Sequence, residues 1–160
     1  MADSYRNLPP LTREPIEIRP FDPCDEPQVV ALWSAVFGYQ QPHNEPHRVI
    51  ERKQAVADRL FFVAVEREQI VGTVMGGYDG HRGWIYSLAV SAEKRRQGIG
   101  SALMRFVEGE LAARLCPKIN LQVVANNASV VAFYQLLGYA VEERISLGKV
   151  LTTDNCSRGL

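Results

Sequence analysis

Hydrophobic and polar residues alternate along the chain with two different periods, which separate the expected strands from the expected helices. A period near two is typical of a strand, and a period near 3.6 is typical of a helix with one apolar face. The first pattern predicts strands at 16–19, 60–65, 70–78, 84–90, 119–123 and 141–151, of which the last alternates least clearly. The second predicts helices at 22–37, 46–56, 98–115 and 130–137. This mixture predicts an α/β domain.

The first of these helices also has recognisable ends in the sequence. Asp22 is a suitable capping residue, and Pro23 suits the first helical position because its missing N–H would be unpaired there in any case. Gly38 is a natural stop, because glycine readily adopts the left-handed conformation that ends many helices.

The chain has the length of one domain. Its 160 residues are enough to bury a core without outside help. Residues 1–15 are polar and proline-rich and are expected to form a flexible lead-in, and 152–160 a polar tail, so the domain is expected to span 16–151. No apolar run approaches the roughly 18 residues of a membrane span, and the first residues do not look like a secretory signal. We therefore expect a cytoplasmic protein without a membrane partner.

Composition excludes several further classes. The 18 Lys and Arg residues balance the 18 Asp and Glu residues, which argues against a nucleic acid as the partner. The three cysteines, Cys24, Cys116 and Cys156, are far apart and form no CxxC pair, so neither a disulfide scaffold nor a cysteine zinc site is expected. His43 and His47 flank Glu45, but Pro46 interrupts the helix that a zinc protease motif needs, so no metal is expected.

The segment between the strand at 84–90 and the helix at 98–115 carries the clearest chemical signal. It contains the basic run Lys94-Arg95-Arg96, followed by Gly98 and Gly100. The first turn of a helix has unpaired backbone N–H groups and a positive partial charge. Glycines let an anion approach these groups closely. The segment therefore suits a diphosphate.

Three known phosphate-binding loops are candidates for this segment. A P-loop requires Gly-Lys-Ser/Thr, which is absent. A dinucleotide fingerprint requires a small third residue where Leu103 stands, and an acidic residue about 20 positions after the glycines, where the chain has 118–120, Lys-Ile-Asn. The coenzyme A loop Arg-x-x-Gly-x-Gly fits as Arg95, Gly98 and Gly100. A basic loop with an ordinary glycine turn is the alternative that the segment alone leaves open.

A second motif favours the coenzyme A interpretation. The segment 127–139 reads Asn-Ala-Ser-Val-Val-Ala-Phe-Tyr-Gln-Leu-Leu-Gly-Tyr. Together, the two motifs resemble those of the GNAT superfamily of N-acetyltransferases, and the resemblance covers about residues 16–151. The stretches 72–83 and 146–149 are more particularly similar to the small bacterial YpeA group of this family, which implies a bacterial source.

The resemblance implies both a fold and a coenzyme site. The expected fold is a mixed, mostly antiparallel central sheet of six or seven strands, splayed between strands four and five and flanked by about four helices. The pantetheine arm of acetyl-CoA would lie along the strand that ends at Val90, at a bulge, and the diphosphate would bind the start of the following helix. The implied coenzyme-binding residues are Leu88, Ala89, Val90, Arg95, Arg96, Gln97, Gly98, Ile99, Gly100, Ser101 and Asn127.

The resemblance further implies a direct attack of an amine on acetyl-CoA, which is a co-substrate. Tyr134 matches the tyrosine that acts as general acid in the family. The general base has no obvious counterpart, because Tyr86 and Ser87 stand where many members carry an acid. Gln122 replaces the glutamate of members that acetylate the N-termini of ribosomal proteins. A water chain or, less well supported, Glu51 would take the proton.

The acceptor is left open as a small-molecule or peptide amine. In the family, the segment 38–48 would cover the acceptor site. An acyl-CoA-binding sensor without turnover is the alternative function, and a transferase of a longer acyl chain is a third. Either a monomer or a homodimer is compatible with the sequence.

Overall fold

The computed structural model describes residues 15–38 and 41–151. The chain forms two compact units, one ending at Gln122 and the other beginning at Val123. The expected lead-in at 1–15, apart from Pro15, the expected tail at 152–160 and Cys156 lie outside the described residues. The segment 38–48, expected to cover the acceptor site, is described except for residues 39–40.

A single mixed sheet runs through the first unit. In the described residues it has the strand order β1-β2-β3-β4-β5. Its strands are β1 (Glu17–Pro20), β2 (Phe61–Glu66), β3 (Gln69–Tyr78), β4 (Gly83–Val90) and β5 (Ile119–Leu121). All neighbouring strands are antiparallel except β4 and β5, which are parallel. The predicted mixed, mostly antiparallel sheet is therefore confirmed.

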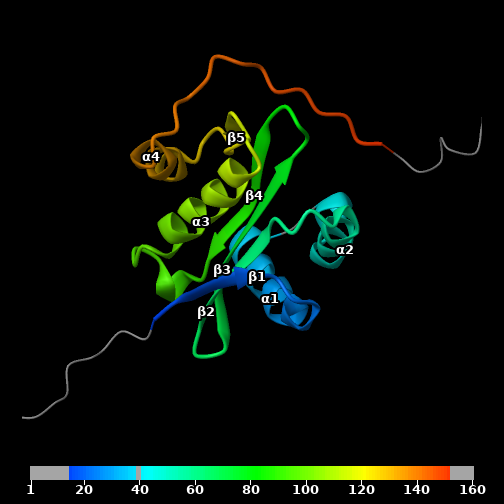
Figure 1. Cartoon of the computed structure of the whole chain (residues 1–160), viewed down its shortest axis with the longest axis vertical. Coiled ribbons are helices and arrows are strands. Elements are labelled where there is room, and N and C mark those ends of the chain that lie inside the picture. The colour runs from blue at the N-terminus through cyan, green and yellow to red at the C-terminus, as the bar shows by residue number, and fades with distance from the viewer. Residues whose placement is uncertain (1–14, 39–40, 152–160) are drawn as a thin grey trace, which may run out of the picture. The chain divides into compact units, whose positions relative to one another are not determined.

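Helices cover both faces of this sheet. They are α1 (Glu26–Phe37), α2 (Pro46–Val56) and α3 (Ile99–Ala113). Short 3₁₀ turns stand before α1, before α2 and in the loop after β4, at Pro23–Asp25, Pro42–Asn44 and Ala92–Lys94. Figure 1 shows α1 and α2 on one face of the sheet and α3 on the other. Among the described residues, none of the helices has both the length and the hydrophobicity of a membrane-spanning segment.

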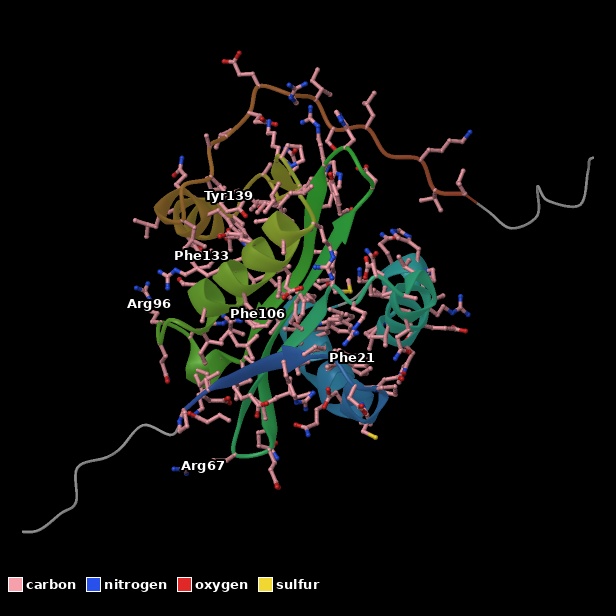
Figure 2. The ribbon with its side chains drawn as sticks, viewed as in Figure 1. Phe21, Arg67, Arg96, Phe106, Phe133 and Tyr139 are labelled. Carbon is pink, nitrogen blue, oxygen red and sulfur yellow. The ribbon has the colours of Figure 1, made fainter. Side chains whose placement is uncertain are left out.

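Strand β2 is buried because helices pack on both faces of the sheet at this strand. The ring of Phe61 stacks on Phe21 and on Trp33 of α1, with centroids 4.5 and 5.6 Å apart. The next residue, Phe62, points to the opposite layer and meets Phe106 of α3 edge-on at 4.9 Å. Successive side chains of a strand point to opposite faces, so β2 contributes to two cores at once. Figure 2 labels Phe21 and Phe106, one on either side of the sheet.

Two glycines of β3 allow α3 to pack directly on the strand. A Cβ atom built on Gly72 would lie 2.9 Å from Cδ1 of Leu103, and one built on Gly76 would lie 2.8 Å from Cγ2 of Val107. Both distances are shorter than van der Waals contact allows. The absence of a side chain at these positions sets the height of α3 above the sheet, and therefore the position of its first turn.

The predicted ends of the first helix are confirmed, with one refinement. Asp22 caps the 3₁₀ turn that begins at Pro23 and leads into α1, and its side chain accepts a hydrogen bond from the amide of Cys24. Gly38 ends α1 in the left-handed conformation, with φ of 56°. The buried Asp25 accepts two hydrogen bonds from the Arg19 guanidinium, at 2.7 and 2.8 Å, so β1 and the start of α1 are joined.

The expectation of six or seven strands is wrong, because the sheet of the described residues has five. The segment 141–151, predicted as the last strand, has no regular secondary structure. Its apolar side chains are exposed, among them Ile145 at 89% and Leu147 at 91%. The charged run Glu142-Glu143-Arg144 breaks the alternation that a half-buried strand requires. None of the described residues pairs with this segment as a strand.

The second unit contains helix α4 (Ala128–Leu136). Asn127 caps it, because its side-chain oxygen accepts a hydrogen bond from the amide of Val130 at 3.3 Å. In this helix the ring of Tyr134 lies between Phe133 and Tyr139, with centroid distances of 5.1 and 5.6 Å. With α4, the described residues contain four α-helices, as expected from the sequence.

Candidate active site

Strand β4 carries a bulge in the segment where the resemblance places the pantetheine arm of acetyl-CoA. Thr73 pairs with Ala89, and Met75 pairs with Tyr86. Two residues of β4, Ser87 and Leu88, therefore face a single residue of β3. Ser87 has a φ of 50°, the left-handed region that residues with a Cβ rarely occupy. The expected bulge is thus found in β4, with a strained residue at its centre.

Because of the bulge, Tyr86 before it and Ala89 after it point to the same face of the sheet. Ala89 belongs to the apolar cluster around Trp33 of α1, as does Met75. Tyr86 pairs with Met75 and so faces the same layer, although Tyr86 and Ala89 are three positions apart. In an unbroken strand, residues three positions apart would face opposite layers. Tyr86 is 51% exposed and contributes a phenol on this face.

One edge of β4 is paired over only part of its length. Strand β5 pairs with the start of β4, from Gly83 to Ile85. From Tyr86 to Val90, no described strand pairs with this edge, because β5 ends at Leu121. Main-chain N–H and C=O groups at an unpaired edge can pair with an extended ligand. The expected splaying of the fourth and fifth strands agrees with this short pairing.

The loop after β4 leads into α3 through two left-handed residues. Arg96 has a φ of 59° and Gly98, the N-cap of α3, has a φ of 83°. No side-chain hydrogen bond from the N-cap residue closes the start of the helix, and no atom of the described residues lies within 4 Å of a Cβ built on Gly98. The amides of the first turn, Ile99, Gly100 and Ser101, have no acceptor within the helix. Backbone amides that lack an acceptor, at a helix start with free space beside Gly98, are suited to bind an anion.

The three basic side chains of this loop have different surroundings. Lys94 forms an ion pair with Glu66 of β2, so its charge is already compensated. Arg95 donates a hydrogen bond to the carbonyl oxygen of Val90 at 3.3 Å. Arg96 is exposed and points away from the sheet in Figure 2. Arg96 is therefore the residue of this run best placed to supply charge to a ligand.

The residues predicted to bind the coenzyme fall into two groups. Ten of them lie in one continuous stretch of the first unit, from the end of β4 through the loop to the first turn of α3. Within this stretch the side chains of Ala89 and Ile99 are buried, with 2% exposed each, so these two residues can offer only main-chain groups. Asn127 belongs to the second unit, where its side-chain oxygen is engaged in capping α4.

Tyr134, the predicted general acid, has a strongly altered acidity. It is 9% exposed, and this burial raises the pKa of its phenol to about 12. Burial disfavours the charged phenolate, so the ring keeps its proton throughout the neutral range. The residue can therefore donate a proton or a hydrogen bond, as a general acid must.

Of the residues that the sequence suggested for a metal or a base, Glu45 and His47 have other partners, and Glu51 is exposed. Glu45 accepts hydrogen bonds from the amides of His47 and Arg48 and so caps α2. His47 lies 2.7 Å from Glu26 of α1, and this hydrogen bond raises the pKa of its imidazole. Glu51 is exposed on α2. In the described residues no three His, Cys, Asp or Glu side chains gather in a way that could hold a metal ion.

A buried pair that the sequence did not suggest lies next to the bulge. Thr73 is fully buried in β3 and donates to the carbonyl oxygen of Ser87 at 3.0 Å. The indole of Trp33 donates to the Thr73 hydroxyl at 2.7 Å. A threonine amid glycine and apolar residues is the only trace of this arrangement in the sequence. Its partners lie 40 and 14 positions away, too far for a local pattern to reveal.

Comparison with known proteins places the chain in a family. Residues 27–139 match the model of the Acetyltransferase (GNAT) family. The fold is similar to that of a transcriptional regulator from Bacillus halodurans C-125, with 23% identity, a TM-score of 0.70, and coverage of 85% of this chain and 99% of that chain. It is also similar to the ribosomal-protein-S18-alanine N-acetyltransferase from Escherichia coli, with 22% identity, a TM-score of 0.66, and coverage of 77% and 76%.

A third similar structure contains a coenzyme derivative. It is AAC(6')-Iy in complex with the bisubstrate analog CoA-S-monomethyl-acetylneamine, with 13% identity, a TM-score of 0.70, and coverage of 87% of this chain and 100% of that chain. At such identities these likenesses concern the fold. The family match covers most of the chain, and the chain therefore belongs to the acetyltransferase (GNAT) family and is an acyltransferase. Enzymes of this family use acetyl-CoA.

Proposed function

We propose that the protein transfers the acetyl group of acetyl-CoA to a primary amine, within a catalytic domain spanning residues 16–151. The observation that carries this proposal is the uncapped start of α3, which follows directly on the bulged and partly unpaired strand β4. One site offers amides for a diphosphate, and the other offers a strand edge for an extended chain. In acetyl-CoA the diphosphate is joined directly to the extended pantetheine arm, so the diphosphate can bind the start of α3 while the arm lies along β4.

In this proposal the main chain does most of the coenzyme binding. The amides from Arg96 to Ser101 hold the diphosphate, assisted by the positive end of the α3 dipole. The pantetheine arm pairs with Leu88–Val90 in the manner of an added strand. An N–H group at the bulge then stabilises the thioester oxygen when it becomes an oxyanion. The buried side chains of Ala89 and Ile99 are consistent with this main-chain role.

The proposed reaction forms a C–N bond and breaks the C–S bond of the thioester. The neutral amine attacks the carbonyl carbon, and the resulting tetrahedral intermediate expels the thiolate of coenzyme A. The attacking nitrogen loses one proton, and the leaving sulfur gains one. We assign the second proton to Tyr134. Because its pKa is about 12, the phenol is protonated when the thiolate forms. It first donates a hydrogen bond to the developing thiolate and then passes its proton to the sulfur, and a proton from water restores the phenol.

We assign to water the role of accepting the proton that the attacking nitrogen loses. Tyr86 and Ser87 of β4 carry no carboxylate, and Gln122 cannot accept a proton at neutral pH. The glutamine also argues against the N-terminus of a ribosomal protein as the acceptor, because the family members with that activity carry a glutamate there. A small-molecule amine or a different peptide amine is the acceptor we propose.

A thiol-release assay tests this function. Purified protein is mixed with acetyl-CoA and a panel of primary amines, and free coenzyme A is followed over time. We expect turnover with at least one amine, and a decrease of about 100-fold in kcat in Tyr134→Phe, a typical effect of removing a general acid. Tyr139→Phe is the matched control, because it removes a hydroxyl from the same ring cluster and should retain activity.

The same experiment separates the enzyme from a sensor. Tight binding of acetyl-CoA in calorimetry without turnover on any amine would contradict the proposed reaction and support acyl-CoA sensing. Loss of activity in Tyr139→Phe equal to that in Tyr134→Phe would contradict the assignment of Tyr134, because the effect would then come from the ring cluster as a whole.

A further inference from the structure

We propose that Thr73, together with Trp33, is a positioning residue that aims a main-chain N–H of the β4 bulge at the reacting thioester. The inference rests on the proposed function, and it adds residues that do not contact the coenzyme. The two side chains come from α1 and β3, and both have 0% of their surface exposed. Their effect on catalysis is transmitted through the carbonyl group of Ser87.

The hydrogen bonds form a chain with a fixed direction. An indole N–H can only donate, so at 2.7 Å the Thr73 hydroxyl must accept from Trp33. The hydroxyl proton is then left for the carbonyl oxygen of Ser87, 3.0 Å away. Buried polar groups linked in this way reinforce one another and have no water to replace a lost partner. The chain therefore determines where the Ser87 carbonyl points.

The direction of this carbonyl also determines the direction of the next amide. A peptide group is planar, and the described residues contain no cis peptide bond. The N–H of Leu88 therefore points opposite to the C=O of Ser87. Because that C=O is directed at the side-chain hydroxyl of Thr73, on the α1 side of β3, the Leu88 N–H is turned away from Thr73 and therefore toward the other edge of β4. That is the edge of β4 where pairing with β5 has already ended.

The conformation of Ser87 explains why such a restraint is needed. Its φ of 50° is unfavourable for a residue with a Cβ. Such a conformation persists only where surrounding contacts fix it. Without the Thr73 hydroxyl, the Ser87–Leu88 peptide is free to rotate toward an ordinary extended strand. An oxyanion donor that must reorient during the reaction stabilises the transition state less than one already in place.

Two substitutions of Thr73 form a matched pair for the test. Thr73→Val keeps the branched shape and removes the hydroxyl, whereas Thr73→Ser keeps the hydroxyl and removes a methyl group. With acetyl-CoA and an accepted amine, we expect Thr73→Val to lower kcat by roughly 10- to 100-fold. Calorimetry should show a Kd for coenzyme A within about threefold of the wild-type value, because the diphosphate amides are unaffected. Thr73→Ser should retain most of the wild-type kcat.

Three outcomes would overturn the inference. The first is an unchanged kcat in Thr73→Val, and the second is an equal loss in Thr73→Ser, which would indicate a packing role. The third is a parallel loss of coenzyme A affinity. If Thr73→Val does not fold, Trp33→Phe serves in its place, because it removes the first donor and retains an aromatic ring. A kcat lowered severalfold at unchanged Kd supports the inference in that variant, and an unchanged kcat opposes it.

Hydrogen–deuterium exchange distinguishes a failure of this inference from a failure of the proposed function. Peptides covering residues 86–90 should exchange faster in Thr73→Val than in Thr73→Ser, whether or not any amine is acetylated. Faster exchange in Thr73→Val, in a protein that acetylates no amine, would support the inference that Thr73 restrains the bulge and contradict only the acetyltransferase proposal. Equal exchange in both variants of an active protein would contradict the inference that Thr73 restrains the bulge, and the acetyltransferase proposal would still hold.

Discussion

The Nε atom of Arg95 lies 3.3 Å from the carbonyl oxygen of Val90, so the loop after β4 is tied to the end of the strand that precedes it. The ion pair between Lys94 and Glu66 ties the same loop to β2. Two of the three basic side chains thus already have a partner within the protein. The third, Arg96, is exposed beside the uncapped start of α3.

The first prediction concerns this difference. Arg96→Glu should weaken acetyl-CoA binding about five- to tenfold at low ionic strength, because a negative charge would then face the diphosphate. The effect should shrink as salt is raised, since exposed charges are screened. Titration calorimetry at two salt concentrations measures both. Arg105→Glu is the control, because Arg105 is exposed on the same helix, beyond its first turn. A similar loss of affinity in the control would indicate a general charge effect.

The second prediction concerns Gly98. Within the part of the chain that the structure describes, no atom lies within 4 Å of a Cβ built on Gly98, but its φ of 83° is unfavourable for any residue with a Cβ. Gly98→Ala should therefore cost about 1–2 kcal/mol of stability and change the loop that presents the amides. We expect acetyl-CoA binding to fall at least tenfold, measured by calorimetry. Gly80→Ala carries the same kind of strain in the β3–β4 hairpin, at φ of 86°.

Comparing these two variants isolates the ligand effect. Both should lower the melting temperature, and only Gly98→Ala should lower affinity for the coenzyme. Full affinity in Gly98→Ala would show that the first turn of α3 does not hold the diphosphate.

The third prediction tests how α3 is held against the sheet. Gly76→Ala would place a methyl group 2.8 Å from Cγ2 of Val107, which forces the helix away from β3. Such overpacking should lower the free energy of unfolding by roughly 1–3 kcal/mol. Adding Val107→Ala should recover part of this loss, because it makes room for the new methyl group. Urea unfolding of the two single variants and the double variant measures this coupling. Additive effects would show that the two residues do not touch.

The fourth prediction uses the acidity of Tyr134. Its pKa is about 12 in the folded protein and about 10 when unfolded, so the folded state holds the proton more tightly. The resulting stabilisation is fully present below pH 10 and is lost as pH rises from about 10 to 12. A shift of this size corresponds to roughly 3 kcal/mol. Tyr134→Phe should therefore lose less stability than the wild type over this range in urea unfolding.

Absorbance of phenolate provides an independent reading of the same group. The phenolate absorbance that the wild type shows in excess of Tyr134→Phe should appear near pH 12. The corresponding absorbance difference between the wild type and Tyr139→Phe serves as the comparison. A Tyr134 difference that titrates near pH 10 would contradict the burial of its ring.

The parts of the site that follow from local chemistry could be predicted from the sequence. Glycines after a basic run mark the start of α3, and Asn127 is the first residue of the motif that forms α4. These signals lie within a few residues of one another. The four helices likewise follow from periodicity, whereas the mixed, mostly antiparallel sheet follows only from the resemblance to a family.

What the sequence could not reveal depends on residues far apart in the chain. The ion pair between Lys94 and Glu66 spans 28 positions, and the bond between Trp33 and Thr73 spans 40. Neither has a local pattern. The expected last strand failed for a related reason. Apolar residues such as Ile145 suit a strand, but a strand also needs a neighbour to pair with, and the sequence of 141–151 does not specify one.

The bulge in β4 is separable from the rest of the sheet. Tyr86 pairs with Met75 and Ala89 with Thr73, so removing one residue between Tyr86 and Ala89 would leave both pairs and both facings unchanged. A chain shortened by one residue at this point could still assemble the same five strands, with a regular β4. It would lose only the peptide group that turns outward. The additional residue is therefore dispensable for the architecture, and an excision variant would fold while lacking the one amide that the proposed chemistry requires.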